Sequence, residues 1–174
     1  MIAIIDYGAG NLRSVQKACE AVGAEAVITA DKDVIAQADH VILPGVGAFG
    51  DCMQSLNRAN LTDAVRRAAL GGKPFLGICL GLQILFESSE ESPGVSGLSL
   101  LKGKVLRIPA APGLKIPHIG WNSLEIKKDG GLFRSITGKP YVYFVHSYYL
   151  KAAEDVVTAT APVSYTHLRA HETR

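Results

Sequence analysis

The sequence predicts an α/β protein with an open, mostly parallel central sheet flanked by helices and an additional antiparallel region. Up to residue 88, short apolar runs that suit buried strands alternate with helical patterns, as is typical of βαβ units. After residue 88, strand patterns follow one another with few helices between them. Hydrophobic residues make up 48% of the 174-residue chain and charged residues 20%, which is sufficient for a core of this kind.

The first strands are predicted from short apolar runs that end in polar residues or glycine. The run IAIID at residues 2–6 leads into the turn YGAGNLRS, after which Ser14–Val22 carries a helical pattern. Further strands are predicted at residues 25–30 (EAVITA) and at His40–Leu43, which runs into a Pro-Gly loop.

A long helix and a strand–turn–helix unit are predicted next. Asp51–Leu70 has a helical pattern, and Gly71 and Gly72 after it suit a helix C-terminus. Residues 74–78 (PFLGI) predict a fourth strand, and Leu80–Ser88 predicts a helix. Together these elements predict a parallel sheet that is covered on both faces.

The second half of the chain is predicted to consist mainly of strands. The segment SSEESPGVSG predicts a loop, and the last of the strand patterns alternates in a way that suits a sheet with one wetter face. The chain contains neither a repeat nor a linker, so a single domain is expected over residues 1–162. The predicted strands are KVLRI, NSLEI, YVYFVHSYYL and DVVTATA, at residues 104–108, 122–126, 141–150 and 155–161.

Residues 163–174, VSYTHLRAHETR, are predicted to lie outside this domain. The segment has no apolar period and is expected to supply neither a strand that continues the sheet nor a closing helix. It resembles a translated sequencing adapter more than an evolved protein sequence. We therefore expect a domain that is incomplete at its C-terminus and is followed by a non-native tail.

Bulk properties argue against several classes of function. A formal net charge of +2 is too small to favour nucleic acid or an acidic membrane as a partner. No apolar run has the length of a membrane span, and the N-terminus lacks the features of a signal peptide. Cys19, Cys52 and Cys79 are widely spaced and odd in number, so neither a disulfide framework nor a zinc site is expected. The sequence thus predicts a cytoplasmic protein without a metal or other cofactor, with Cys19 and Cys52 as core residues of helices.

The sequence FLGICLGLQILFE at residues 75–87 places Cys79 between two glycines at a predicted strand-to-helix junction. The pattern G-x-C-x-G at such a junction is typical of a nucleophile elbow, a strained turn in which Gly77 and Gly81 leave room for the backbone. The thiol would project at the carboxyl end of the sheet, where open α/β proteins bind ligands. The helix that starts at Leu80 would favour the thiolate.

A thiolate that attacks a carbonyl group also needs donors for the resulting oxyanion. The N–H of Leu80, directly after the nucleophile, is one candidate. The other is expected in the loop LPGVGAFG (Leu43–Gly50), where Gly45 and Gly47 allow the backbone to approach a ligand or to rotate a peptide plane. The alternative for this loop is an ordinary strand-to-helix turn.

Five motifs, spread in order from residue 1 to about residue 162, resemble the class I glutamine amidotransferases. The motifs are IIDYGAGNL, LPGVGAFGD, KPFLGICLGLQ, IPHIGWN and YFVHSYY. DYGAGNL and PHIGWN are similar in particular to the glutaminase subunits of imidazole glycerol phosphate synthase, in histidine biosynthesis. The resemblance implies the fold of that family and a glutamine-hydrolysing activity.

The resemblance also implies roles for individual residues. Cys79 would attack the side-chain amide of glutamine and form a thioester with loss of ammonia, and water would then release glutamate. The N–H groups of Val46 and Leu80 would form the oxyanion hole, with Val46 in place only after a peptide flip that depends on the partner. Substrate-binding residues would be Gly45, Gly47, Gln83, Ser147 and Tyr148; Gln83, four residues after the nucleophile, lies on the same helix side.

The implied partner is a cyclase subunit with a (β/α)8-barrel fold, which would form a heterodimer with this chain and consume the ammonia. By resemblance, Asn11, Trp121 and Tyr143 would lie at or near the interface. Two of these residues have structural alternatives. Trp121 could belong to the core, as tryptophan usually does, and Asn11 could simply cap the first helix.

The family's catalytic histidine and glutamate, in an H-P-E motif, have no counterpart in these 174 residues. His171 and Glu172 are adjacent, so on an extended segment they would point to opposite faces. His40, His118 and His146 are expected to be structural or exposed. We therefore expect this chain to turn over glutamine poorly, although it has the sequence of a glutaminase.

Three alternatives stay open at this point. The chain could serve another synthase, for example in pyridoxal phosphate synthesis, although DYGAGNL argues against that. It could be a non-catalytic binding or regulatory module, as the lack of a base suggests. It could also be a stress protein or peptidase with a cysteine elbow, which would leave Gln83 and the PGVG loop unexplained.

Overall fold

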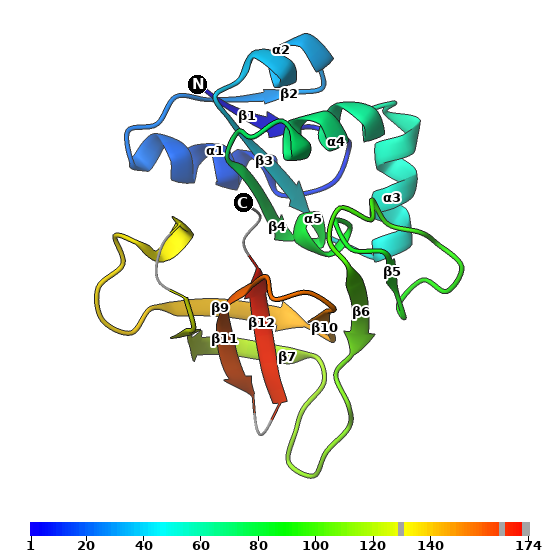
Figure 1. Cartoon of the computed structure of the whole chain (residues 1–174), viewed down its shortest axis with the longest axis vertical. Coiled ribbons are helices and arrows are strands. Elements are labelled where there is room, and N and C mark those ends of the chain that lie inside the picture. The colour runs from blue at the N-terminus through cyan, green and yellow to red at the C-terminus, as the bar shows by residue number, and fades with distance from the viewer. Residues whose placement is uncertain (129–130, 164–165, 172–174) are drawn as a thin grey trace. The chain divides into compact units, whose positions relative to one another are not determined.

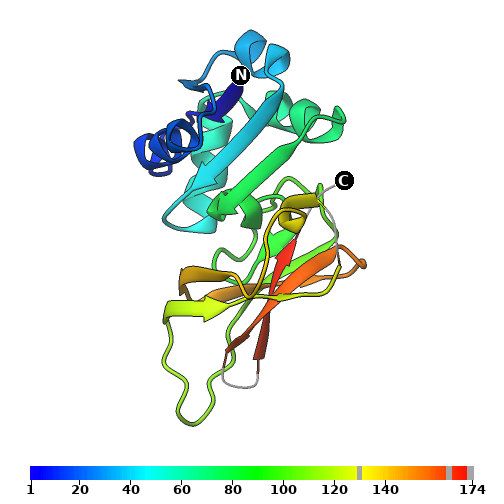
Figure 2. The ribbon, with the colours of Figure 1, turned by 90° about the vertical axis from the view of Figure 1, so that its left-hand side faces the viewer.

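The structure of the chain is a computed structural model that describes residues 1–128, 131–163 and 166–171, with side chains described up to residue 161. The chain forms two compact units, one over residues 1–101 and a second that begins at Lys102 (Figures 1 and 2). The sequence predicts no boundary at this point, because no linker composition marks it. In the part of the chain that the structure describes, every helix is too short or too polar to cross a bilayer.

The first unit contains a four-stranded parallel sheet with the strand order β2-β1-β3-β4. This arrangement confirms the predicted parallel sheet. All four strands were predicted from apolar runs, and their observed ends differ from the predicted ones by at most two residues. The strands are β1 (Ile2–Ile5), β2 (Ala26–Thr29), β3 (His40–Gly45) and β4 (Phe75–Cys79).

Apolar side chains alternate between the two faces of this sheet. Ile4 and Ile42 pack with Cys19 of α1 on one face. The neighbouring residues Ala3 and Leu43 point to the other face and are fully buried as well, so both faces are covered. The helices of this unit are α1 (Leu12–Ala21), α2 (Lys32–Gln37), α3 (Phe49–Arg58), α4 (Thr62–Leu70) and α5 (Leu80–Gln83); a two-residue strand, β5 (Ser88–Ser89), follows.

The single helix predicted over Asp51–Leu70 is wrong, because the structure has two helices there. The chain leaves α3 at Ala59, and Asn60 adopts a left-handed conformation with a φ of 55°. Asparagine tolerates this conformation better than most residues, which ends α3 before α4 starts. As predicted, Gly71 and Gly72 follow the end of α4.

The helix predicted over Leu80–Ser88 is also wrong in length, because α5 ends at Gln83. The N–H groups of Leu85 and Phe86 bond to carbonyls three residues earlier, which tightens the chain into turns. The side chains of Ile84, Leu85 and Phe86 are all buried, so this segment has no solvent-facing side. The apolar run that resembled a helix face is therefore a buried turn.

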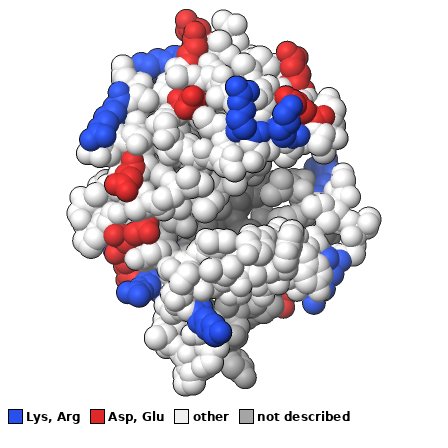
Figure 3. Space-filling model, turned by 180° about the vertical axis from the view of Figure 1, so that it is seen from behind, with Lys and Arg blue, Asp and Glu red and all other residues white. Residues whose placement is uncertain are grey.

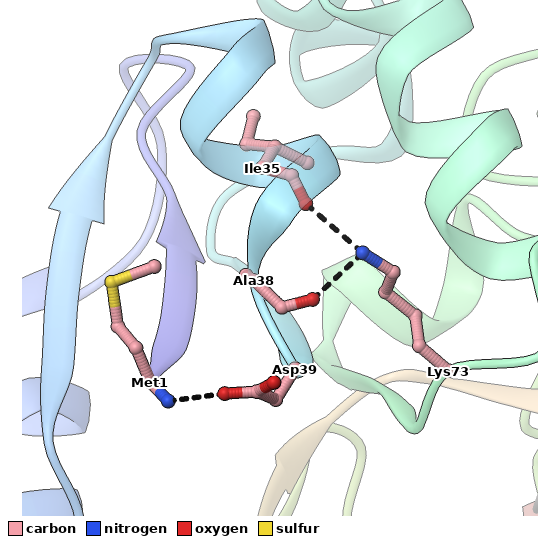
Figure 4. A network of polar contacts seen from close by, with 5 residues as sticks. All are labelled: Met1, Ile35, Ala38, Asp39 and Lys73. Carbon is pink, nitrogen blue, oxygen red and sulfur yellow. Dashed lines mark hydrogen bonds and ion pairs between the residues drawn. The ribbon is translucent and has the colours of Figure 1, made fainter.

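The helix α2 was not predicted, since six residues are too few for a helical period. Asp31 caps it by accepting the N–H of Asp33 at 2.8 Å. At its other end, the ammonium group of Lys73 donates to the carbonyls of Ile35, Ala36 and Ala38, the last at 2.7 Å. Figure 4 shows this contact beside the ion pair of the Met1 amino group with Asp39.

We expect Lys73→Met to lower the free energy of unfolding of the first unit by about 1–2 kcal/mol, because the carbonyls at the end of α2 lose a charged donor. The measurement is the urea midpoint for alkylation of Cys19 and Cys52, which are buried in this unit. Lys32→Met removes an exposed lysine from the start of the same helix and serves as the matched control. Equal midpoints for the two variants would contradict the prediction.

The second unit is built of antiparallel strands, as predicted. β6 (Gly103–Arg107) pairs with β10 (Tyr148–Ala152), and β7 (His118–Ser123) pairs with β9 (Tyr141–His146). The strand predicted over 141–150 is divided at Ser147, and the strand predicted over 122–126 is divided between β7 and β8. The remaining elements are β8 (Glu125–Ile126), a 3₁₀ turn (Gly131–Phe133), β11 (Val157–Val163) and β12 (Thr166–His171).

The expectation that residues 163–174 supply no strand is wrong for part of that segment. The backbone of β12 pairs antiparallel with β11, with Val163 opposite Thr166. β12 continues no apolar period, but the backbone donors and acceptors of β11 suffice to pair it. Its non-native origin stays a prediction.

The core of the second unit lies between the strands. It contains Ile108, Leu124 and Phe133, with Val142 and Phe144 of β9 packed against them. Residues 142 and 144 therefore point inward, and residues 141, 143 and 145 point outward. This alternation decides which side chains of β9 meet solvent.

Candidate functional site

Cys79 is the last residue of β4 and directly precedes α5, as the elbow prediction requires. Its φ of 55° and ψ of −117° make it one of three non-glycine residues with positive φ among the described residues. The thiol is free, and the residue is exposed. A strained, exposed cysteine at the carboxyl edge of a parallel sheet has the geometry of a nucleophile.

Close backbone packing around the elbow explains its glycines. A Cβ atom on Gly81 would collide with the carbonyl oxygen of Leu43, and one on Gly77 would stand 2.7 Å from the Cα of Leu82. At Gly45 a Cβ atom would stand 2.6 Å from the N atom of Gly81. These glycines allow α5 to pack directly on the ends of β3 and β4.

The start of α5 favours the thiolate as expected, because the backbone N–H of Leu80 lowers the pKa of Cys79, but this effect does not decide the protonation state. Cys79 is exposed as a residue, but neighbouring protein atoms partly desolvate it, and this desolvation raises the pKa of its thiol more than the backbone N–H of Leu80 lowers it; the charge of Glu91 raises it further. Since α5 has only one turn, its dipole is too small to overcome the burial. At neutral pH the sulfur is therefore a thiol that needs a base.

We expect the rate of alkylation of Cys79 by iodoacetamide to keep rising with pH beyond 9.0, the ordinary pKa of the thiol. A raised pKa leaves less thiolate at every pH below it, and only the thiolate reacts. The rate is measured by peptide mass spectrometry between pH 6.5 and 10, with a short cysteine peptide as reference. A plateau below the pH at which the peptide levels off would contradict this prediction.

The candidate oxyanion loop lies beside the elbow. The parallel register places Gly45 opposite Cys79. Val46, the next residue, is 55% exposed, and Gly47 has a φ of 98°, which favours glycine. Leu80 directly follows Cys79 and its backbone N–H lowers the pKa of the thiol; its role as an oxyanion donor stays a prediction.

Two residues near Cys79 differ in how well the sequence indicated them. Gln83, predicted from the family resemblance and consistent with helical spacing, is the last residue of α5 and is buried. Glu91 was missed: its carboxylate accepts the N–H of Phe49 at 2.7 Å and thereby caps α3, whose own cap residue Ala48 makes no side-chain bond. An acidic residue in a serine-rich loop carries no signal of this role.

Ser147 and Tyr148, the other predicted substrate-binding residues, lie in the second unit. Ser147 separates β9 from β10, and its carbonyl accepts the N–H of Ile108 at 2.9 Å. Tyr148 begins β10 opposite Arg107. Their contribution to a glutamine site stays a prediction.

The outward face of β7 and β9 is apolar and exposed. Trp121 is 68% exposed, which rules out the core alternative for this residue, and its ring meets that of Tyr143 edge-on at 5.5 Å between centroids. Figures 1 and 2 place the two strands behind β11 and β12, and Figure 3 shows this side of the second unit with a broad area free of Lys, Arg, Asp and Glu. We call this surface the apolar ribbon; it consists of Ile119, Trp121, Tyr141, Tyr143 and Val145.

Asn11, the third predicted interface residue, is the N-cap of α1. Its side-chain oxygen accepts the N–H of Ser14 at 3.4 Å. The capping alternative is therefore confirmed, and it leaves the interface role a prediction, since a capping side chain lies at the surface.

His40, the histidine of the first unit, is remote from Cys79. His40 begins β3, five residues from the end that faces Cys79, so roughly 16 Å of strand separates them. In the second unit, the ring of His118 bonds to Asn122 at 2.7 Å, and that of His146 to the carbonyl of Tyr148 at 2.7 Å. Burial lowers the pKa of His146, so its ring is neutral at pH 7. The side chain of His171 and all of Glu172 lie outside the described part of the chain.

Among the described residues, no group of three or more His, Cys, Asp or Glu side chains could hold a metal ion.

Comparison with known proteins adds the chemistry that the geometry leaves open. Residues 3–173 match the family "Glutamine amidotransferase class-I". The chain is 52% identical over 159 residues to "Imidazole glycerol phosphate synthase subunit HisH" of Methanothermobacter thermautotrophicus, covering 91% of this chain and 78% of that one. For the protein of the same name from Aquifex aeolicus the identity is 52% over 158 residues, covering 90% and 75%. For that of Listeria monocytogenes it is 46% over 164 residues, covering 94% and 78%.

Solved structures share the fold at low sequence identity. "Crystal structure of glutamine amidotransferase" superposes with a TM-score of 0.71 at 18% identity and covers 99% of this chain and 90% of that one. "Structure of PurLQS from Thermotoga maritima" superposes with a TM-score of 0.70 at 23% identity and covers 97% and 76%. These likenesses confirm the predicted fold class.

Proposed function

This chain belongs to the class I glutamine amidotransferase family, and from that premise we propose that it is the glutaminase subunit of imidazole glycerol phosphate synthase, acting in histidine biosynthesis. The observation that carries the proposal is the exposed, strained Cys79 at the elbow of a chain about 50% identical to HisH subunits. The names of these relatives favour this synthase over one that makes pyridoxal phosphate. A cytoplasmic location is part of the proposal.

The chemistry of the proposal starts at the sulfur of Cys79. The sulfur adds to the side-chain amide carbon of glutamine, and the negative charge that develops on the oxygen meets the N–H of Leu80 and, after a peptide flip, that of Val46. Ammonia leaves as the thioester forms, and water then releases glutamate. Gly45, Gly47 and Gln83 lie beside the elbow, where they would hold the substrate, together with Ser147 and Tyr148.

The apolar ribbon supports the proposed partner. Natural monomers rarely expose a contiguous apolar area that contains Trp and Tyr, and such residues dominate the energetics of protein interfaces. We propose that the ribbon docks on the cyclase subunit, a (β/α)8 barrel, to form a heterodimer. Trp121 and Tyr143 would be its central anchors, and Asn11 would lie near the same interface.

Turnover by these 174 residues is proposed to be weak. The Cys79 thiol has a raised pKa, and the sequence contains no H-P-E motif. His40 lies at the start of β3, whereas Cys79 lies beside the end of that strand. Glutamine binding and a single covalent reaction at Cys79 do not require thioester hydrolysis. They therefore do not need the general base that activates water in that step. The site is therefore best tested by covalent labelling.

A glutamine-analogue chloroketone tests the proposal directly. We expect it to modify Cys79 ahead of Cys19 and Cys52, and we expect millimolar glutamine, but not glutamate, to slow the modification. The cyclase subunit should accelerate labelling, and glutamate release in its presence should stay far below that of a HisH subunit with an H-P-E motif. Labelling without preference for Cys79, or without protection by glutamine, would instead favour a non-catalytic module.

A further inference from the structure

Two buried side chains outside the proposed catalytic set hold the Pro44–Gly47 loop. The hydroxyl of Tyr7 donates to the carbonyl of Pro44 at 2.7 Å, and the thiol of Cys52 donates to the carbonyl of Val46 at 3.4 Å. Tyr7 is 4% exposed and Cys52 is 1% exposed. Burial raises the pKa of both groups, so each keeps the proton that it donates.

The two bonds fix alternate peptide planes of the loop. In a trans peptide, the carbonyl of one residue and the N–H of the next belong to one rigid plane and point in opposite directions. Tyr7 therefore orients the plane that carries the N–H of Gly45, and Cys52 orients the plane that carries the N–H of Gly47. The plane between them carries the carbonyl of Gly45 and the N–H of Val46, and neither side chain holds it.

We propose that Tyr7 and Cys52 are positioning residues that hold the planes on either side of the Gly45–Val46 peptide, so that this plane alone turns when Val46 donates to the oxyanion. The inference rests on the proposed function, which supplies the role of Val46. Turning one plane changes ψ of Gly45 and φ of Val46 and leaves the flanking planes in place. Glycine at position 45 tolerates such a change.

The need to hold two separate peptide planes also explains why the two side chains that donate these hydrogen bonds come from different elements. Tyr7 follows β1, and Cys52 lies in α3, which begins just after the loop. A loop held only by its own chain would shift as a whole when one plane turned. Anchors on two packed elements confine the movement, which keeps the N–H of Val46 within reach of the oxyanion.

Two reagents that attack the same sulfur separate this role from general stability. In the chloroketone reaction the sulfur adds to the ketone, the oxygen becomes an oxyanion, and the sulfur then displaces chloride. A C–S bond to the neighbouring carbon replaces the C–Cl bond, the bond between the sulfur and the carbonyl carbon breaks as C=O reforms, and the thiol proton passes to solvent. Iodoacetamide alkylates Cys79 by direct displacement of iodide, without an oxyanion.

In Tyr7→Phe and in Cys52→Ala, we expect the maximal chloroketone rate at Cys79 to fall about five- to tenfold. This is less than the 10²–10³-fold cost of deleting an oxyanion donor outright, because the donor is misplaced rather than lost. The chloroketone concentration at half-maximal rate and the iodoacetamide rate should each stay within about twofold, since the substrate pocket and the sulfur itself are unchanged.

Two matched variants complete the experiment. Cys52→Ser keeps a donor to Val46 and should restore the chloroketone rate, and Cys19→Ala removes a buried cysteine of α1 and should leave it unchanged. An unchanged or faster chloroketone rate in Tyr7→Phe and Cys52→Ala would overturn the inference, as would equal slowing with both reagents. Failure of the unmodified chain to react with the chloroketone at Cys79 would instead overturn the proposed function.

Discussion

Replacing Cys79 with glycine is expected to abolish labelling by the chloroketone and, at the same time, to stabilise the first unit by about 1 kcal/mol. The residue has a φ of 55° with a ψ of −117°, which costs a non-glycine residue about 1–3 kcal/mol. Glycine removes that cost. It also increases the conformational entropy of the unfolded chain, and this offsets part of the gain in stability. Any glutamate release by the unmodified chain should be lost as well, since no nucleophile remains.

Cys79→Ala is the matched control for this experiment. Alanine also lacks the sulfur, but its Cβ keeps the unfavourable conformation, so labelling should vanish without a gain in stability. Stability is read from the urea midpoint at which Cys19 and Cys52 become accessible to alkylation, because both lie buried in the first unit. Equal midpoints for the glycine and alanine variants would show that the elbow stores no strain.

Replacing Trp121 with alanine is expected to weaken binding of the cyclase subunit at least about 30-fold. Truncation of a central aromatic anchor typically costs 2–4 kcal/mol of binding free energy. The side chain is 68% exposed and lies in the middle of the apolar ribbon, so the folded chain should lose little stability. The dissociation constant is measured by calorimetry with the purified cyclase.

Leu70→Ala serves as the control for Trp121→Ala. Leu70 is 73% exposed at the end of α4 and is not part of the apolar ribbon, so its truncation should leave the affinity within about twofold. Tyr143→Ala, which removes the ring that meets Trp121 edge-on, should weaken binding as well. Unchanged affinity in both ribbon variants would refute the ribbon as the docking surface.

The sequence predicted what depends on local patterns. The four parallel strands follow from apolar runs of strand length, and the elbow follows from Gly77 and Gly81 around Cys79. The break at Asn60 was missed because the apolar periodicity continues on both sides of a single left-handed residue. The tight turn at Ile84–Phe86 was missed because its buried apolar residues look like a helix face in the sequence. β12 was missed because its pairing partner, not its own pattern, makes it a strand.

The candidate site shows the same division. Cys79 and its glycines could be predicted because their spacing reflects backbone packing, whereas Gln83 was predicted from the family resemblance. The raised pKa of Cys79 could not be predicted, since it depends on partial desolvation and on Glu91, which is twelve residues away in the sequence. The exposure of Trp121 was equally hidden, because the residue type argues for burial and only the alternation along β7 and β9 turns it outward.

The apolar ribbon has a consequence for the cell. An exposed aromatic surface promotes non-specific association with other hydrophobic surfaces, including those of further copies of the same chain. Surplus chains would therefore aggregate or occupy chaperones rather than wait harmlessly for a cyclase. If the ribbon docks on a cyclase as proposed, synthesis of the two proteins at matched levels would keep this surface covered.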